Sequence, residues 1–319
     1  MLTWRRLGFI FDVRGRSSWM HHFAQNPNPV VMGDRLRVFF TCRPERAPDG
    51  SAVSRIGWCD LDRADPTRVL GWAERPVFEL GGPGTFDEFG AMPGGLVYVQ
   101  ERKELWLYYV GWSRAQPTPY RWTIGLAVSQ DDGRTFARWS NGPLLGMDRD
   151  DPYLLACPRV WRHAPDQWLM LYQSGTGWNL HDNHWESVYV ARRATSRDGL
   201  NWIREPGPLF PAVAENECQT SSALFSRPGH PGHNLLFSWR HGIDFRNPER
   251  GYRLGYASSE DLVSWRRDDR MAGLAPAASG WDSEMICYPG VVEVDGRVLL
   301  FYCGNEFGKD GFGAAELIG

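Results

Sequence analysis

The run Arg37-Val-Phe-Phe-Thr-Cys-Arg43 is the first of five similar aromatic segments in this chain of 319 residues. The other four are Leu105-Trp-Leu-Tyr-Tyr-Val-Gly-Trp112, Trp168-Leu-Met-Leu-Tyr172, Leu235-Leu-Phe-Ser-Trp-Arg240 and Val298-Leu-Leu-Phe-Tyr302. A spacing of about 60 to 70 residues is typical of a repeat architecture rather than of independent domains.

Each aromatic run has strand-like neighbours on both sides. A short apolar segment precedes it across a turn such as Gly33-Asp34, which is hairpin chemistry, and a third apolar segment follows it. In three of the units a further turn leads to an aromatic residue, as in Ser129-Gln-Asp-Asp-Gly-Arg-Thr-Phe136. This S-x-D-x-G pattern is an Asp box, in which we expect the aspartate to bond the backbone of its own turn. A fourth, outer strand is therefore predicted.

Four antiparallel strands in five repeats, without helical periodicity, predict an all-β five-bladed β-propeller. We expect a single domain over residues 1–319, with one core. The last unit lacks a fourth strand, and the segment Leu7-Gly-Phe-Ile-Phe11 is predicted to supply it, which closes the ring and removes an exposed edge. The blade-like units are predicted at residues 21–80, 81–150, 151–212, 213–275 and 276–319.

Composition narrows the possible partners. The formal net charge is −3 and there is no basic stripe, so neither nucleic acid nor a membrane is expected as a partner. The N-terminus lacks a signal-peptide pattern and no apolar run is long enough to span a bilayer, so a cytoplasmic location is expected. The six cysteines are scattered singly, and we expect them to be buried. No cofactor and no metal is expected.

Acidic residues lie just before the strands that should line the axis of the propeller. Cleavage of a glycosidic bond needs one carboxylic acid to protonate the leaving oxygen and a carboxylate to activate the attacking group. Glu284 is our candidate acid, Asp87 the candidate base or orienting group, and Glu217 would tune the pair. The alternative is that these acids bond loop backbone or pair with Arg159 and Arg240. The candidate catalytic residues are Asp87, Glu88, Glu217 and Glu284; strand alternation should direct only one of the first two to the channel.

Basic, amide and aromatic side chains accompany the acids. Arginines near the channel are expected to bind a phosphate or a carboxylate, or alternatively to pair with nearby acids. Trp178 belongs to a histidine-rich stretch that we expect in a loop over the channel mouth, where its ring would stack on a sugar. The expected substrate-binding residues are His22, Asn26, Arg43, Arg159, Trp178, Arg240, His241, Tyr288 and Asn305.

Three segments resemble those of five-bladed glycosidase-like proteins. They are Gly84-Thr-Phe-Asp-Glu-Phe-Gly90, Gly280-Trp-Asp-Ser-Glu-Met-Ile-Cys-Tyr-Pro289 and Gly304-Asn-Glu-Phe-Gly-Lys-Asp-Gly-Phe-Gly313. That superfamily includes arabinanase, xylosidase and invertase-like hydrolases and mannoside phosphorylases. The resemblance implies an axial, acid-lined pocket and a carbohydrate or activated-sugar substrate, but fold-level analogy does not by itself fix an activity.

One position departs from that superfamily. Arabinanase-type and invertase-type members have an Asp at the head of the first blade as base or nucleophile, whereas this chain has Gln25-Asn26-Pro27-Asn28. An amide cannot accept a proton in this role. The leading expectation is a glycoside hydrolase-like enzyme, with inverting chemistry preferred by analogy. The alternatives are a phosphorylase or glycosyltransferase, which would use an anionic donor or acceptor such as phosphate, and a carbohydrate-binding propeller without activity.

Overall fold

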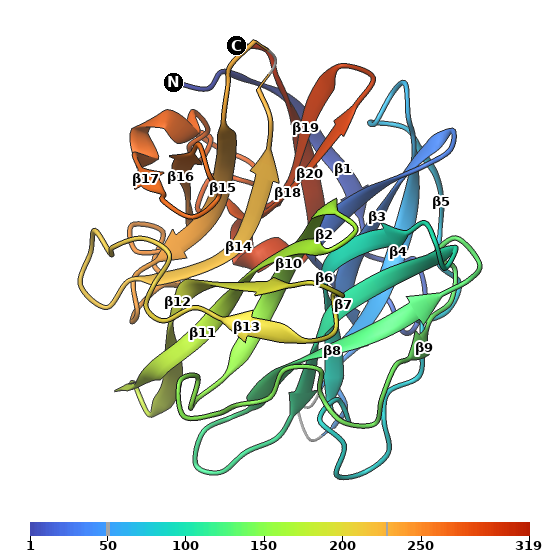
Figure 1. The fold of residues 1–319 in the computed structure, drawn as a ribbon, viewed down its shortest axis with the longest axis vertical. Helices are drawn as coiled ribbons and strands as arrows, with labels where there is room; N and C mark the ends of the chain where they lie inside the picture. Colours follow the sequence, from blue (N-terminus) through green and yellow to red (C-terminus); the bar gives the residue numbers. More distant parts are fainter. Residues whose placement is uncertain (49–51, 228) are drawn as a thin grey trace.

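The computed structural model describes residues 1–48, 52–227 and 229–319, and it confirms the five-bladed propeller. Five sheets of four antiparallel strands are arranged around a central axis (Figure 1). The first blade comprises β2 (His22–Met32), β3 (Arg35–Arg43), β4 (Arg55–Asp62) and β5 (Val69–Trp72), and the second comprises β6 (Gly90–Val99), β7 (Glu104–Ser113), β8 (Arg121–Ser129) and β9 (Ala137–Arg138). The third comprises β10 (Leu155–Ala164), β11 (Gln167–His181), β12 (His184–Ser196) and β13 (Trp202–Arg204), and the fourth comprises β14 (Cys218–Phe225), β15 (His233–Arg240), β16 (Arg253–Ser259) and β17 (Arg266–Arg267). The fifth comprises β18 (Cys287–Val294), β19 (Arg297–Cys303), β20 (Gly311–Leu317) and the N-terminal strand β1.

The N-terminal strand closes the ring, as predicted. β1 (Trp4–Asp12) pairs antiparallel with β20 and becomes the outermost strand of the last blade. The first strand of each blade contacts the first strands of the two neighbouring blades, in the order β2, β6, β10, β14, β18 and back to β2. These five strands therefore surround the axis, and residues at the same level of each strand converge there.

The inner strands are irregular at one shared level. Every one of them shows a register shift in its pairing with the second strand of its blade. Four of the five place a non-glycine residue at positive φ there, namely Asn26, Cys157, Ser221 and Tyr288, with φ between 45° and 57°. Bulges of this kind turn side chains out of the regular alternation, and they often lie next to functional sites. Here they direct polar groups toward the axis.

Apolar side chains fill the space between the blades. The five aromatic runs are almost completely buried, and Phe39, Tyr108, Leu171, Phe237 and Phe301 are among the fully buried residues. The Asp boxes close the outer turns as expected: Asp131 accepts hydrogen bonds from the backbone amides of Arg134 and Thr135. All six cysteines are free; five are buried and Cys157 is partly exposed.

Helical structure is minor. It comprises the 3-10 turn η1 (Asp269–Ala272) and the short helix α1 (Asn305–Gly308), whose Glu306 and Phe307 have positive φ. Within residues 1–48, 52–227 and 229–319, no helix has the length and apolar character needed to cross a bilayer. α1 matters because it lies beside the axis, where it contributes to the site described next.

Candidate functional site

A cavity of about 600 Å³ opens at one end of the propeller axis. All five blades contribute to it, because its walls come from the ends of the inner strands and from the loops that follow. Eight aromatic residues dominate the lining, together with two acids and four arginines. The lining residues are Phe23, Gln25, Arg43, Arg46, Met92, Trp112, Trp122, Ser187, Tyr189, Arg240, Phe245, Arg246, Tyr252, Glu284, Met285, Tyr288, Glu306 and Phe307.

Arg240, at the end of β15, is a buried cation of this cavity. Its Nε donates to the hydroxyls of Tyr189 and Tyr252, at 3.0 and 3.3 Å, and its other nitrogens donate to the carbonyls of His241 and Ser187. The guanidinium also lies 3.7 Å from the ring centre of Phe245. No carboxylate of the described residues is within ion-pair distance of it. Arg240 is therefore held rigidly while its charge is left without a counter-ion.

Arg43, at the end of β3, is a second cation of the same kind. Its Nε donates to the Ser54 hydroxyl at 3.0 Å, and its guanidinium lies 4.6 Å from the ring centre of Phe23. Burial lowers the pKa of Arg43 to about 10, so the side chain is still charged at neutral pH. No ion pair joins Arg43 to a carboxylate in the described part of the chain. Two such arginines make the cavity suited to an anionic group.

Two buried tyrosines, Tyr189 and Tyr252, and the partly buried Tyr288 connect the walls between these cations. The hydroxyls of Tyr189 and Tyr252 form a short hydrogen bond to each other, and the ring of Tyr252 lies 5.3 Å from that of Tyr288. Burial raises the pKa of Tyr189, Tyr252 and Tyr288 above the ordinary value for a phenol. These hydroxyls are therefore neutral at physiological pH and can serve as hydrogen-bond donors to a ligand.

Two carboxylates line the cavity, Glu284 and Glu306. The Glu284 side chain makes no hydrogen bond or ion pair with the described residues, while its backbone amide donates to Asn305 Oδ1 at 2.8 Å. Asn305 also donates to the carbonyl of Gly280 and so fixes the loop that carries Glu284. Glu306 pairs with Lys309 at 2.8 Å. Glu284 is thus the carboxylate that remains available for chemistry, and Asn305 positions it.

Asn26 and Arg159 close the axis below the cavity. Asn26 donates from Nδ2 to the carbonyl of Pro93 at 2.6 Å, and its Oδ1 accepts from Arg159 at 2.8 Å and from Ser221 at 3.4 Å. Arg159 also donates to the carbonyl of Pro289 at 3.2 Å. These five residues, which we call the axial plug, come from all five blades. The head of the first blade is therefore next to a structural crosslink, and Gln25 lines the cavity directly above it.

The structure places Asp87 and Glu217 away from this cavity, in ion pairs at the corners of their blades. Asp87 is fully buried and accepts hydrogen bonds from Tyr109 at 2.8 Å and from Arg138 at 3.2 Å. Glu217 is also buried and pairs with Arg267 at 2.6 Å. These contacts agree with the alternative of structural pairing, although the partners are not the arginines that we expected.

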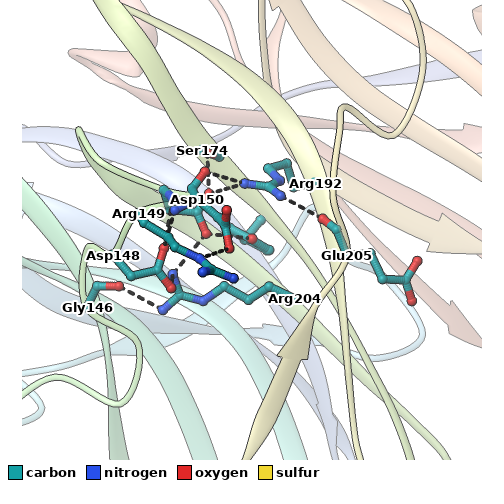
Figure 2. Close-up of polar contacts among 10 residues, drawn as sticks. Gly146, Asp148, Arg149, Asp150, Ser174, Arg192, Arg204 and Glu205 are labelled. Carbon is teal, nitrogen blue, oxygen red and sulfur yellow. Dashed lines mark hydrogen bonds and ion pairs between the residues drawn. The ribbon is translucent and has the colours of Figure 1, made fainter.

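The same arrangement recurs in two further blades, so it is a repeated structural device. Asp282 accepts from Tyr302 and from Arg6. Asp151 accepts from Tyr172 and pairs with Arg192 at 2.6 Å and Arg204 at 2.9 Å. Figure 2 shows how Arg192 and Arg204 reach this point and how they are tied to the carbonyls of Glu205 and Gly146. In all four blades the arginine comes from the outermost strand, and we call these contacts the corner pairs: Asp87–Arg138, Asp151–Arg204, Glu217–Arg267 and Asp282–Arg6.

The other predicted residues surround the cavity without lining it. Glu88 accepts the backbone amide of Gly84 at 2.7 Å and so caps a loop. His22 stacks edge-on against His21, and burial lowers its pKa. Burial also lowers the pKa of His241, which packs against Trp239. Trp178 lies in strand β11 rather than in the expected loop, because the chain there forms a long hairpin with β12. Its ring is 5.1 Å from that of Tyr120, which stacks on the wall residue Trp122, so Trp178 extends the aromatic wall outward.

Several wall residues were not predicted from the sequence. Phe23, Trp112, Trp122, Tyr189, Tyr252 and Glu306 all line the cavity. The sequence shows Trp112 as the last residue of an aromatic run, but the residues of that run do not indicate that its end faces a cavity. Phe23 and Glu306 reach the cavity through positive-φ backbone, which strand alternation does not predict. The one feature of the sequence that could have indicated Glu306 is its place in a Gly-rich segment, Gly304-Asn-Glu-Phe-Gly308.

A second hollow, of about 690 Å³, lies on the outer rim between the third and fourth blades. It is formed by Asp-box turns and outer strands, including Asp198, Trp202 and Asp261. Asp198 and Asp261 are engaged in their own turns. The axial cavity is the better candidate site, because it combines the Glu284 carboxylate with two buried arginines that form no ion pair with the described residues.

Two proteins of Mycobacterium tuberculosis are similar to this chain over almost their whole length. Uncharacterized protein MT1551 of strain CDC 1551 / Oshkosh is 31% identical over 318 residues, which cover 99% of each chain. Uncharacterized protein Rv1502 of strain ATCC 25618 / H37Rv is 32% identical over 317 residues, with the same coverage. The chain belongs to the family of these two proteins. No protein-family model matches the chain.

Solved structures share the five-bladed fold at lower identity. A glycoside hydrolase superposes with a TM-score of 0.74 at 19% identity, covering 99% of this chain and 92% of its own. A glycosyl hydrolase from Bacteroides ovatus superposes with a TM-score of 0.67 at 15% identity, with 99% and 93% covered. A structure from work on the GH130 family of mannoside phosphorylases and its glycoside hydrolases gives 0.66 at 15%, with the same coverage. These likenesses confirm the superfamily fold that the three segments indicated.

Proposed function

We propose that this protein is an enzyme that cleaves or forms a glycosidic bond in the axial cavity, with an inorganic or organic phosphate as the partner of the sugar. The observation that carries the proposal is the pairing, in one cavity, of a single unengaged carboxylate, Glu284, with two cations that have no counter-ion, Arg43 and Arg240. The fold shared with glycoside hydrolases and mannoside phosphorylases supports the substrate class.

The aromatic wall supplies the sugar site. Flat rings that bury apolar faces of a pyranose and leave its hydroxyls to polar groups are the usual solution for carbohydrate ligands. Trp112, Trp122, Phe245 and Phe307 line the cavity and are available for this contact. A volume of about 600 Å³ is sufficient for one or two sugar rings together with a phosphate.

Glu284 would act as the general acid. In the phosphorolytic direction its proton passes to the glycosidic oxygen as the C–O bond breaks, and a phosphate oxygen forms the new bond to the anomeric carbon from the opposite face. The products are a glycosyl phosphate and the free leaving-group alcohol, and Glu284 regains a proton from solvent. Because phosphate is itself the nucleophile, no second protein carboxylate is required, which fits the amide Gln25 at the head of the first blade.

Arg43 and Arg240 would hold the phosphate. Hydrogen bonds between a guanidinium and an anion are charge-assisted, and they are stronger in a cavity from which water is partly excluded. The neutral hydroxyls of Tyr252 and Tyr288 can donate to the same oxygens, since the pKa of each phenol is raised by burial. In this proposal Asp87, Glu88 and Glu217 take no part in the chemistry.

Hydrolysis is the second candidate, and Glu306 favours it. This residue gives the cavity a second carboxylate, and an inverting glycosidase uses one carboxylic acid and one carboxylate that activates water. Lys309 lies 2.8 Å from the Glu306 carboxylate and orients it. The two candidates share Glu284 as acid and differ in the attacking group.

The deciding experiment measures turnover of a panel of mannosides, glucosides, galactosides and xylosides, with and without inorganic phosphate. We expect release of a glycosyl phosphate that depends on phosphate concentration. Glu284→Gln should lower kcat by about 10² to 10⁴-fold while calorimetric binding of the same sugar is retained, because the amide cannot deliver a proton. Equal turnover without phosphate would identify a hydrolase, and unchanged turnover in Glu284→Gln would contradict the acid assignment for both candidates.

A further inference from the structure

The axial channel contains a second, smaller cavity on the far side of the axial plug. Along the inner strands the large cavity is lined by Gln25, Met92 and Tyr288, and the next residue in each strand, Asn26, Pro93 or Pro289, belongs to the plug. The residues that follow line a cavity of about 110 Å³. Its walls are Asn28, Pro29, Val30, Gly95, Leu96, Arg159, Val160, Trp161, Ser222, Ala223, Leu224, Gly290 and Val291, and so it is shared by all five blades.

Arg159 carries the only formal charge in the lining of this small cavity. The residue is 6% exposed, and it donates hydrogen bonds to two neutral oxygens, Asn26 Oδ1 and the Pro289 carbonyl. Its buried Nε has no hydrogen-bond partner among the described residues, and no carboxylate there forms an ion pair with it. Burying a charge in this way is costly unless it is paired, and burial lowers the pKa of Arg159 only to about 10, so it stays charged at neutral pH.

Three other buried arginines are neutralised by acids. Arg37, Arg192 and Arg267 have side chains about as buried as that of Arg159, and each has a carboxylate within 2.7 Å. Arg43 and Arg240 also lack an ion pair with the described residues, but they line the large cavity, where the proposed phosphate would pair with them. Arg159 lies in the plug, outside the proposed sugar site. Its missing counter-ion therefore needs an explanation that the proposed function does not supply.

We propose that the small cavity binds a small monovalent inorganic anion of halide size, which serves as the counter-ion of Arg159. The Arg159 guanidinium would donate to the anion, and the Ser222 hydroxyl, which forms no hydrogen bond with the described residues, can donate to it as well. A space of 110 Å³ corresponds to about three or four water molecules, which accommodates a halide with residual water but not a sugar.

The anion would also stabilise the closed ring of blades. Arg159 ties the third blade to the first through Asn26 and to the fifth through Pro289, and neutralising its charge removes the main cost of that crosslink. Because an anion that binds only the folded protein stabilises it by mass action, stability should rise with anion concentration and then saturate. General salt screening, by contrast, would not saturate in this range.

The test compares chloride with gluconate, an anion too large for the cavity, at equal ionic strength. We expect chloride to raise Tm by about 2 to 5 °C with saturation below 0.2 M, and gluconate to leave it unchanged. Crystals soaked in sodium bromide should show an anomalous peak within hydrogen-bond distance of the Arg159 guanidinium. Arg159→Gln should remove both the peak and the chloride dependence, and Ser222→Ala should weaken the apparent chloride affinity several-fold.

Two results would overturn the proposal. One is a bromide soak of the wild-type protein with no peak at Arg159, even where other halide sites are occupied. The other is a chloride dependence that is the same in Arg159→Gln as in the wild type. If Arg159→Gln does not fold, the wild-type bromide map and the Ser222→Ala titration still decide the matter, and neither measurement depends on the protein's being a phosphorylase or a hydrolase.

Discussion

The corners of the blades and the axial cavity use the same side chains in opposite ways. At the corners every arginine meets a carboxylate, as in Asp151 with Arg204 and Glu217 with Arg267. At the cavity two arginines and one carboxylate are kept apart: Arg43 and Arg240 donate to hydroxyls and carbonyls, and the Glu284 side chain has no partner among the described residues. The corners are therefore satisfied electrostatically, whereas the cavity is not.

This difference separates structural charge from functional charge. A buried ion pair fixes geometry but offers nothing to a ligand, since its donors and acceptors are already used. Cations held only by neutral partners remain without an ion pair, and an anionic ligand can form one with them. Acidity near the axis is thus a poor guide to catalysis in this fold, and the absence of a partner is a better one.

The largest expected effect comes from breaking a corner pair. Asp151→Asn leaves both Arg192 and Arg204 without their buried carboxylate, and removing one partner of such a contact typically costs about 3–5 kcal/mol of the free energy of unfolding. Urea denaturation followed by tryptophan fluorescence measures this loss. The KM of the protein that remains folded should not change.

Glu88→Gln is the matched control for Asp151→Asn. It also neutralises an acid near an inner strand, but Glu88 accepts one backbone amide on the surface, so we expect a loss of about 1 kcal/mol or less. A denaturation midpoint for Asp151→Asn equal to that of Glu88→Gln would show that the corner pairs do not hold the blades together.

The second effect concerns the cavity arginines. Arg240→Gln removes a charged donor from the proposed phosphate site, and the loss of a charge-assisted hydrogen bond of about 1.5–3 kcal/mol weakens binding roughly 10 to 100-fold. The KM for phosphate, or the calorimetric Kd for a sugar phosphate, reports it. Arg204→Gln makes the same substitution at a corner and should lower Tm but leave phosphate affinity intact. Equal affinity of the two variants for phosphate would show that Arg240 has only a structural role.

The fold was predictable from the sequence because it depends on periodic features. Five apolar runs with turn residues between them define the blades, and the N-terminal strand followed from counting strands in the last unit. The Asp boxes were also recognisable, since their hydrogen bonds are local. Contacts within a hairpin or a turn involve residues that are close in the sequence, so a local sequence pattern can predict them.

The site was predictable only in part, because its contacts are not local. Glu284, Arg43, Arg240 and Tyr288 line the cavity as expected, but the partners that distinguish them from Asp87 and Glu217 lie some 50 residues away. A spacing signal was nevertheless present. The corner acids precede their arginines by 51, 53 and 50 residues in three successive blades, and such regularity marks a structural repeat rather than a catalytic set. The backbone bulges that turn Asn26 and Tyr288 toward the axis left no comparable signal.

The smallest expected effect concerns the carboxylates of the Asp boxes, which resemble the corners in being fully satisfied but lie on the surface. Burial alone would raise the pKa of Asp198, but hydrogen bonds from the backbone amides of Asn201 and Leu200 and from the Asn201 side chain outweigh it and lower the pKa to about 2. A carboxylate whose pKa is depressed in the folded state stabilises the protein above its ordinary pKa. This contribution is lost as the pH falls from about 4 toward 2.

Asp198→Asn should therefore lower Tm slightly at pH 7 and flatten its decline between pH 4 and pH 2. Because Asp198 is exposed, solvent screening limits the difference to less than about 1 kcal/mol. The matched control is Asp182→Asn at the tip of the β11–β12 hairpin, where the carboxylate is 86% exposed and contacts only His181, at 3.6 Å. Differential scanning calorimetry at pH 7, 4 and 3 separates the two variants. If the two variants lose the same stability at every pH, the Asp-box hydrogen bonds add nothing beyond an ordinary surface charge. Hydrogen bonds and ion pairs to a carboxylate would then stabilise this propeller only where they are buried, as they are at the corners.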